Sequence, residues 1–136
     1  MRIFLDANVL VSVFNREYPH YDGCARCLSL AGKNGHELLV SALSLGIVFY
    51  FAEKKSGRAA AREKISALLQ KVRVSPCGES EAIAAVKEKK ADDFEDALQL
   101  HSALAAESEI IITNNPSDYH FASIPVRRPE DFLKML

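Results

Sequence analysis

Short apolar segments without polar alternation are the feature that most constrains the fold of this chain. The clearest are residues 2–5 (Arg-Ile-Phe-Leu) and 110–113 (Ile-Ile-Ile-Thr), and residues 37–40 and 72–75 are weaker examples. Strands that are apolar at successive positions are typical of parallel sheets, because helices cover both faces. Helical patterns separate these segments, as in chains that alternate strand and helix. We therefore predict a three-layer α/β/α fold with a central parallel sheet of four to five strands.

The segments between the predicted strands carry helix-start and helix-stop signals. We expect helices over residues 9–14, 21–31 and 42–55, over 58–71, from Ser80 to 89, from Asp92 or Asp93 to 107, and from Pro129 onward. Serine and aspartate suit N-caps because their side-chain oxygens accept hydrogen bonds from free backbone N–H groups, and Ser41 is a third such residue. Proline suits the first turn of a helix. A short edge strand is expected near residues 124–126.

Length and composition indicate an ordinary globular protein. A chain of 136 residues fits one domain, residues 1–136, and its contents of 49% hydrophobic and 26% charged residues are unremarkable. The net charge of −1 gives little overall attraction to nucleic acid, so a polyanion needs a local basic patch. The longest apolar run, residues 47–52, is too short to cross a bilayer, and a strand begins too early for a secretory signal. With three cysteines in no spaced framework, we expect a cytoplasmic protein without membrane contact.

Acidic residues follow or open several of the predicted elements. Asp6 follows the first strand, Asp93 and Asp96 begin a helix, and Asp118 comes shortly after the strand at 110–113. In a parallel sheet, groups beyond the carboxyl ends of the strands converge in one crevice. Carboxylates gathered there repel one another unless a cation or shared protons hold them. The pattern therefore predicts a site for a hard divalent metal, which suggests phosphate chemistry.

Each of these acids also has a simpler structural explanation. Asp6 and Asn8 suit the cap of a short helix, and Asp118 lies in a turn-rich segment. Asp93 suits an N-cap, and Asp96 is a favourable acid for a first helical turn. However, Asp93 and Asp96 are three residues apart, so they share the helical face that continues into the apolar side. We therefore expect both carboxylates to point into the crevice.

The motifs around these acids resemble those of the PIN-domain family across nearly the whole chain. The matching segments are residues 4–10 (Phe-Leu-Asp-Ala-Asn-Val-Leu), 39–44 (Leu-Val-Ser-Ala-Leu-Ser), 93–99 (Asp-Phe-Glu-Asp-Ala-Leu-Gln) and 111–119 (Ile-Ile-Thr-Asn-Asn-Pro-Ser-Asp-Tyr). The resemblance implies a Mg²⁺- or Mn²⁺-dependent ribonuclease. Many bacterial members of the family form the VapC group, the toxins of type II toxin–antitoxin modules. A VapC-like chain implies an RNA substrate, an antitoxin partner and a homodimer.

The resemblance assigns roles to individual residues. Asp6 matches the first metal-binding acid and Asp96 the helix acid that precedes Ala-Leu. Asp93 and Asp118 match acids of the subgroup that carries the Asp-Phe-Glu-Asp-Ala-Leu helix motif, and are expected to join the metal site. The polar side chains expected to orient waters or ligands are Asn8, Thr113 and Asn115.

Two departures from the family pattern leave two functions open. Family members usually carry an acid in the helix after the second strand, where this chain has Leu45, Gly46 and Ile47. Glu53 lies about two turns further, roughly 10 Å along the helix, and is not expected to substitute. Asn115 stands where aspartate is common. The chain is thus either a metal-dependent endoribonuclease or a catalytically weakened PIN-fold module that binds RNA or a protein without cleavage.

The remaining features have weaker functional meaning. Lys54, Lys55, Arg58 and Arg62 form a basic stretch suited to RNA phosphates or, more simply, to a solvated helix surface. Cys24-Ala25-Arg26-Cys27 has the spacing of redox and zinc motifs, but no second ligand pair accompanies it, so we expect core packing. A phosphoryl-transfer domain of the receiver or haloacid-dehalogenase type is disfavoured, because no lysine follows the strand at 110–113 until residue 134.

Overall fold

The computed structural model describes all residues, 1–136, and its centre is a five-stranded parallel sheet. The strands are β1 (Arg2–Leu5), β2 (Glu37–Ser41), β3 (Arg73–Ser75), β4 (Ile110–Ile112) and β5 (Val126–Arg127). Their spatial order is β3-β2-β1-β4-β5, so β1 is central and pairs with β2 and β4. The register places Phe4 beside Leu39 and Ile111. The parallel sheet of four to five strands is confirmed.

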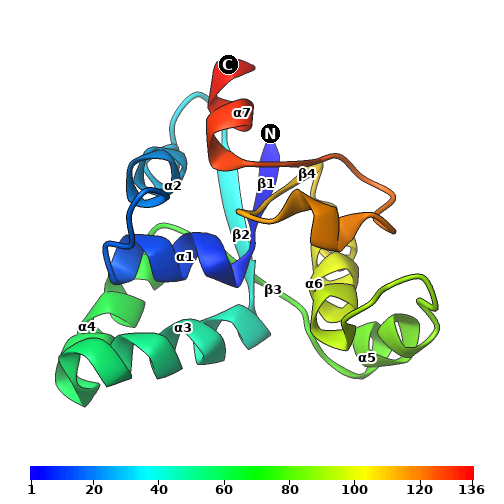
Figure 1. Cartoon of the computed structure of the whole chain (residues 1–136), viewed down its shortest axis with the longest axis horizontal. Coiled ribbons are helices and arrows are strands. Elements are labelled where there is room, and N and C mark those ends of the chain that lie inside the picture. Colours follow the sequence, from blue (N-terminus) through cyan, green and yellow to red (C-terminus); the bar gives the residue numbers. More distant parts are fainter.

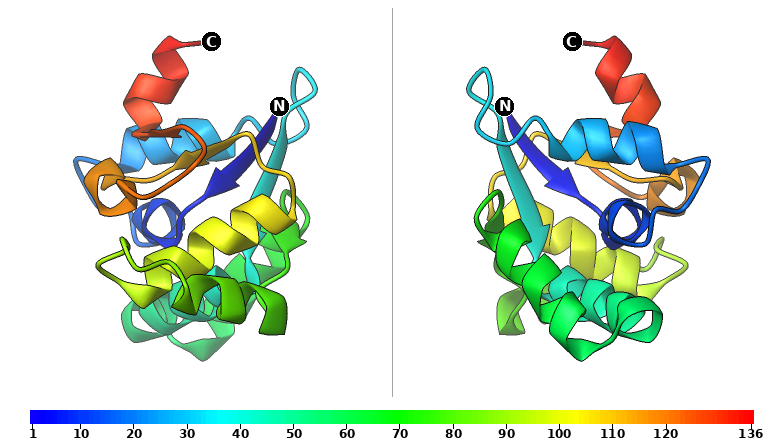
Figure 2. Two further views of the ribbon diagram at one scale, coloured as in Figure 1. Left: turned by 90° about the vertical axis from the view of Figure 1, so that its right-hand side faces the viewer. Right: turned by 90° about the vertical axis from the view of Figure 1, so that its left-hand side faces the viewer.

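Helices cover both faces of this sheet (Figures 1 and 2). They are α1 (Ala7–Phe14), α2 (Tyr21–Leu28), α3 (Ala42–Ser56), α4 (Arg58–Leu69), α5 (Glu79–Val86), α6 (Phe94–Ala105), the 3-10 helix η1 (Pro116–Tyr119) and α7 (Pro129–Lys134). The first four helices and α7 pack on one face, whereas α6 and η1 pack on the other and α5 lies against α6. This is the predicted three-layer α/β/α architecture.

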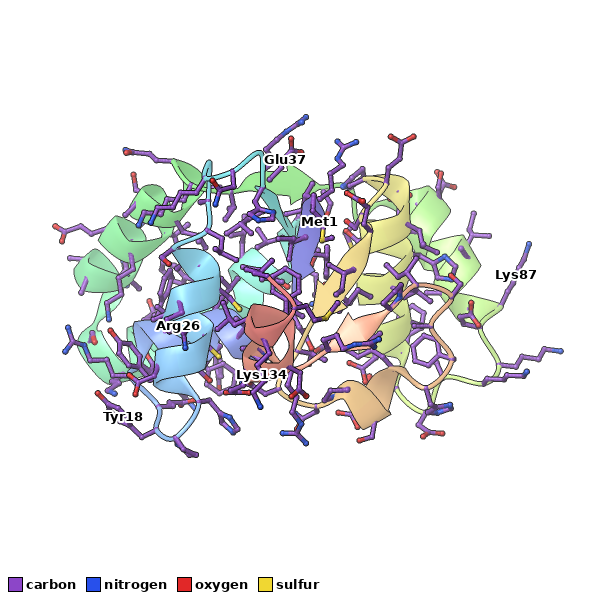
Figure 3. All side chains as sticks on the ribbon, turned by 90° about the horizontal axis from the view of Figure 1, so that it is seen from above. Met1, Tyr18, Arg26, Glu37, Lys87 and Lys134 are labelled. Carbon is purple, nitrogen blue, oxygen red and sulfur yellow. The ribbon has the colours of Figure 1, made fainter.

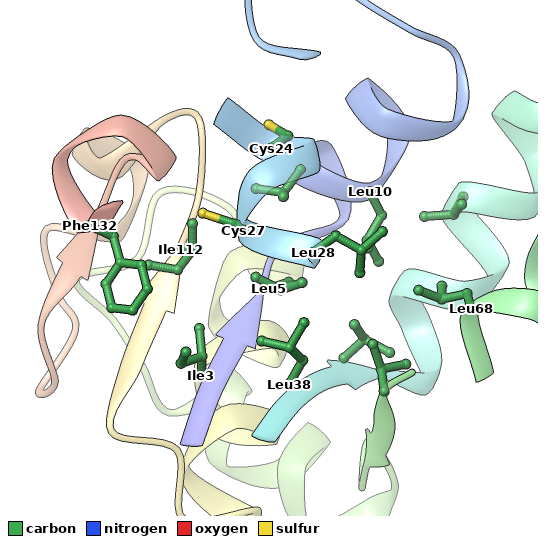
Figure 4. Close-up of a cluster of buried hydrophobic side chains, with 14 of the residues drawn as sticks. Ile3, Leu5, Leu10, Cys24, Cys27, Leu28, Leu38, Leu68, Ile112 and Phe132 are labelled. Carbon is green, nitrogen blue, oxygen red and sulfur yellow. The ribbon is translucent and has the colours of Figure 1, made fainter. Parts of the chain in front are cut away.

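The two faces of the sheet have separate apolar cores because successive side chains of a strand point to opposite faces. Ile3 and Leu5 of β1 belong to the larger cluster, which includes Leu10, Cys27 and Phe132 (Figure 4). The side chain between them, Phe4, belongs to a smaller cluster with Leu39, Leu100 and Ile111. Both clusters are almost fully buried. The absence of alternation in the strands therefore reflects burial on both sides.

Most predicted boundaries hold within a few residues, and one predicted cap is wrong. Ser41 is the N-cap of α3 and accepts a hydrogen bond from the Ser44 N–H at 3.0 Å, as expected. Ser80 is not a cap: α5 begins at residue 79 because the Glu81 carboxylate binds the Gly78 N–H at 2.8 Å. The edge strand lies at 126–127 rather than 124–126. No helix is long and apolar enough to span a membrane.

Candidate active site

A cavity of about 410 Å³ lies at the carboxyl end of the sheet. The helices α1, α3 and α6 begin at this end (Figure 1). We call it the acidic cavity because five of its lining residues are carboxylates. It is lined by Asp6, Ala7, Asn8, Val11, Ser12, Glu17, His20, Ile47, Phe51, Glu95, Asp96, Asn114, Asn115 and Asp118. Residues far apart in the sequence meet here because parallel strands end at the same edge.

Asp6 is the most buried acid of the cavity. Its side chain is both an N-cap and a wall of the cavity: Oδ1 accepts a hydrogen bond from the Ala7 N–H at 2.7 Å, and Oδ2 accepts one from the Thr113 hydroxyl at 2.8 Å. Burial raises the pKa of Asp6, and these two hydrogen bonds oppose the rise. The Tyr119 hydroxyl approaches Asp6 but is buried without a hydrogen bond of normal geometry.

Thr113 and Asn8 join the end of β4 to the start of α1. The Asn8 Nδ2 donates to the Thr113 hydroxyl oxygen at 3.1 Å, and the Asn115 N–H donates to the same oxygen at 3.2 Å. Thr113 is fully buried and does not itself line the cavity. Its contacts fix the directions of Asp6 and Asn8, while Asn115 is exposed on the rim.

Asn114 has a positioning role that sequence reasoning missed. Its backbone N–H donates to the Asn8 Oδ1 at 3.1 Å, and its Nδ2 donates to the Ser12 hydroxyl oxygen at 3.2 Å. The Cys24 thiol donates to its Oδ1 at 3.4 Å. A buried asparagine that binds α1 and α2 in this way holds the segment after β4 in place. The residue type was compatible with a turn, so nothing in the sequence distinguished it.

Asp96 faces Asp6 from the other face of the sheet. It is half-buried in the first turn of α6, and its pKa is raised from 3.8 to about 7. Burial is the largest cause, followed by the negative charges of Asp6, Asp93 and Asp118. Asp118, on η1, is exposed and lines the cavity as expected. The structure thus brings Asp6, Asp96 and Asp118 together.

Asp93 does not point into the cavity, which corrects the sequence-based expectation. Its side chain caps α6 by accepting a hydrogen bond from the Glu95 N–H at 2.7 Å, and the residue is exposed. The three-residue spacing misled because an N-cap residue is not yet helical, so its side chain turns toward the free N–H groups. Asp93 still acts on Asp96 through its charge.

Three further polar residues line the cavity: Glu95, Glu17 and His20. Glu95 is an exposed acid of the first turn of α6, and its place between Asp93 and Asp96 was the one signal that pointed to it. Glu17 and His20 lie in the segment between α1 and α2. Their approach depends on how that segment packs, which local sequence does not reveal.

The α3 side of the cavity is apolar. Ile47 and Phe51 line it, whereas Gly46 is exposed and a Cβ added there would meet no atom within 4 Å. Glu53 is outside the cavity, and its carboxylate lies 3.8 Å from the Arg58 guanidinium. Glu53 therefore does not line the cavity with the other acids.

The predicted basic stretch lies outside the acidic cavity. Lys55 binds the Asn15 carbonyl, and Lys54 stands over the Tyr50 ring, with its Nζ 4.7 Å from the ring centre. Arg62 lines a separate hollow between α3 and α4. These residues are exposed at the far end of α3 and the start of α4.

The two cysteines of the Cys-x-x-Cys segment are core residues, as expected. Cys24 and Cys27 are fully buried in α2, and no disulfide joins them. Burial raises the pKa of the Cys24 thiol to about 11 and of the Cys27 thiol to about 12. Thiols that stay protonated at neutral pH are neither reactive nor ready metal ligands.

The carboxylates fit a hydrated divalent cation rather than a closed protein cage. No three Asp, Glu, His or Cys side chains are arranged to hold an ion by themselves. Mg²⁺ keeps several of its waters and needs only one or two carboxylates. Asp6 is buried and Asp96 is half-buried, and the pKa values of both carboxyl groups are raised. A cation between them would relieve their burial cost and mutual repulsion.

Comparison with known families identifies the class of protein. The family model described as "PIN domain" matches residues 2–117. This match covers most of the chain, so the chain belongs to the PIN-domain family. The family assignment made from the motifs is therefore confirmed.

Individual relatives are distant in sequence and similar in structure. The chain is 25% identical over 135 residues to ribonuclease VapC1 of Aquifex aeolicus (strain VF5), with coverage of 96% of this chain and 92% of the relative. It shares its fold with VapBC2 from Rickettsia felis (TM-score 0.74, 18% identity, 94% and 98% of the two chains). Similar values relate it to VapC20 of Mycobacterium tuberculosis (TM-score 0.68, 18% identity, 90% and 98%).

Proposed function

We propose that this chain is a divalent-metal-dependent endoribonuclease, the toxin component of a type II toxin–antitoxin module. The observation that carries the proposal is the pairing of Asp6 and Asp96 across the carboxyl end of the sheet, with Asp118 and Glu95 on the rim. Two relatives support it, because one is named a ribonuclease and another is described as a toxin that cleaves the sarcin–ricin loop.

In this proposal Asp6 and Asp96 hold Mg²⁺ or Mn²⁺, with Asp118 and Asp93 adding negative charge nearby. The bound ion supplies polarisation of the scissile phosphate and a lowered pKa for the attacking water. Thr113 and Ala7 keep Asp6 oriented by donating to its two oxygens. Asn8 and Asn115 offer neutral hydrogen bonds to waters at the rim. Lys54, Lys55, Arg58 and Arg62 are proposed to contact RNA phosphates beyond the cavity.

The proposal also includes a cytoplasmic location, an antitoxin protein as partner, and a homodimer of this chain. Similar solved structures are described as VapBC, and two of these are bound to DNA. Co-expression with the product of a neighbouring small reading frame, followed by sedimentation velocity, tests both parts. A stable complex and a protomer pair are expected, and a monomer that binds no such product contradicts them.

The decisive experiment is RNA cleavage by purified protein with Mg²⁺, Mn²⁺ or EDTA. Cleavage should require the metal. Asp6→Asn and Asp96→Asn should each reduce it by roughly 100-fold or more, because loss of a residue that only supports a metal ligand already costs up to about 100-fold. Asp131→Asn is the matched control, because Asp131 is an exposed acid on α7 outside the cavity. Cleavage that persists unchanged in both cavity variants does not depend on these carboxylates and contradicts the proposal.

A second function is favoured by the apolar wall of the cavity. Ile47 and Phe51 occupy the side where family members usually carry an acid, and Asn115 is neutral. Fewer charged ligands lower the affinity for a divalent ion. The alternative is therefore a PIN-fold module that binds RNA or a protein without cleavage. RNA binding that EDTA does not change, with no cleavage of any RNA, favours it.

A further inference from the structure

One side of the acidic cavity is apolar and open to solvent. It consists of Ala7 and Val11 from α1, and of Ile47 and Phe51 from α3. Ile47 and Phe51 are one helical turn apart, so this wall runs roughly 6 Å along α3, from the carboxylates toward the end of α1. Phe51 is 43% exposed. An aromatic surface held inside a cavity, beside charged groups, marks a place for a ligand with an apolar face.

The apolar wall continues into an aromatic and cationic surface on α3. The Phe51 and Tyr50 rings meet edge to face with their centres 5.2 Å apart, and Tyr50 is 52% exposed. The Lys54 ammonium lies 4.7 Å from the centre of the Tyr50 ring. An aromatic face near a cation matches a nucleotide, whose base stacks on the ring and whose phosphate attracts the ammonium.

This turn of α3 is held firmly against its neighbours. The Asn15 Nδ2 donates to the Phe51 carbonyl oxygen at 3.3 Å, and Lys55 binds the Asn15 carbonyl. The Lys64 ammonium of α4 donates to the Phe14 carbonyl oxygen at 3.1 Å. The end of α1 is therefore tied to both α3 and α4. A stacking surface whose backbone is already fixed loses little entropy when a base binds.

We infer that Ile47, Tyr50, Phe51 and Lys54 form a subsite for one unpaired nucleotide of single-stranded RNA, next to the carboxylates. The inference rests on the proposed function, since the carboxylates are taken to receive the neighbouring phosphate. The base stacks on Phe51 and packs against Ile47, and Lys54 contacts the backbone. RNA is favoured over an apolar protein side chain because the wall and the carboxylates share one cavity. A duplex keeps its bases stacked, so single strands are preferred.

Tryptophan fluorescence tests the subsite directly. The chain contains no tryptophan, so Phe51→Trp places a single indole at the wall. The variant is made in an Asp96→Asn background and studied in EDTA, which stops metal-dependent cleavage and lowers the charge that repels phosphate. A single-stranded oligoribonucleotide should quench the indole, and the same sequence as a duplex should not. Ile83→Trp is the control, because Ile83 is exposed on α5, far from the cavity. Figure 3 shows Lys87, which follows α5, at the opposite end of the molecule from Tyr18, which lies between the cavity-lining residues Glu17 and His20.

Affinity provides the second readout. In the same background, Phe51→Ala should weaken binding of the single strand roughly 5- to 150-fold, the range for loss of one base–aromatic stack. Phe51→Tyr keeps a flat ring and should restore most of the affinity. Ile83→Ala should leave it unchanged. Circular dichroism of each variant confirms that the fold is intact.

The outcomes separate this inference from the proposed function. Equal affinity of Phe51→Ala and its parent, or an indole unaffected by the single strand, overturns the subsite. Emission that changes with protein concentration and not with RNA also overturns it, because the wall then contacts another protein chain. Metal-dependent cleavage by the unaltered chain, measured separately, leaves the proposed function standing in either case. Quenching without cleavage supports the subsite in a module that only binds.

Discussion

Thr113 donates a hydrogen bond to Asp6, the most buried acid in the cavity. Its hydroxyl donates to Asp6 at 2.8 Å, and its oxygen receives hydrogen bonds from the Asn8 side chain and the Asn115 backbone. Thr113→Val keeps the shape of the side chain and leaves a buried carboxylate oxygen without its donor. We expect a loss of about 2–3 kcal/mol in the free energy of unfolding, measured with urea. Thr113→Ser retains the hydroxyl and should lose less than half as much.

Asp96 makes the stability of the metal-free protein depend on pH. Its pKa is about 7 in the folded chain, compared with an ordinary value of 3.8, so the folded state holds the proton more tightly. Stability from this group is complete below about pH 4 and is lost as the pH rises through about 7. In EDTA, the free energy of unfolding should therefore decrease across this range. Asp96→Asn should flatten that part of the profile; an unchanged profile contradicts the raised pKa.

Gln99 links three elements that surround the cavity. Its Oε1 accepts a hydrogen bond from the Ser41 hydroxyl at 2.6 Å, and its Nε2 donates to the Ser44 hydroxyl oxygen at 2.7 Å. These contacts join α6 to the end of β2 and the start of α3, and all three residues are buried. Gln99→Met should lower the free energy of unfolding by about 1–3 kcal/mol, because it leaves buried polar groups unpaired. Gln70→Met, on the exposed end of α4, should change it by less than about 0.5 kcal/mol.

The elements differ in how far the sequence predicted them. Strands such as 110–112 were predictable because burial on both faces leaves a continuous apolar segment. The start of α5 was not, because a Glu81 side chain rather than Ser80 binds the free Gly78 N–H. For α3, helical periodicity could not reveal which side chains face the cavity, since the helix is apolar around most of its circumference and only packing places Phe51 beside the cavity.

The residues of the candidate site also differ in whether the sequence predicted them. The convergence of Asp6, Asp96 and Asp118 followed from parallel topology, which brings strand ends to one edge of the sheet. Glu17 and His20 were not predictable, because they belong to a connecting segment whose path depends on tertiary packing. Asp6, Asp96 and Asp118 were thus found from the sequence, whereas Glu95, Glu17 and His20 were not, and the expected direction of Asp93 was wrong because its side chain caps α6.

At the scale of the whole molecule, the acidic cavity joins the two outer layers of the fold. Asp6 lies where β1 passes into α1, which packs on one face of the sheet, whereas Asp96 belongs to α6 on the other face (Figure 2). Repulsion between these carboxylates therefore acts between the layers. A cation that binds both favours the folded chain, because the unfolded chain does not bring them together.

Mg²⁺ should consequently stabilise the protein in a saturable way. At a concentration ten times its Kd, the ion should add about 1.4 kcal/mol to the free energy of unfolding, or roughly 3–6 °C in Tm. Differential scanning fluorimetry over a Mg²⁺ series, at constant ionic strength, measures this. Asp6→Asn and Asp96→Asn should each abolish the shift, and Asp131→Asn should retain it. A shift of equal size in all four proteins would show that Mg²⁺ acts on the whole surface, and the carboxylates would then not be the metal site.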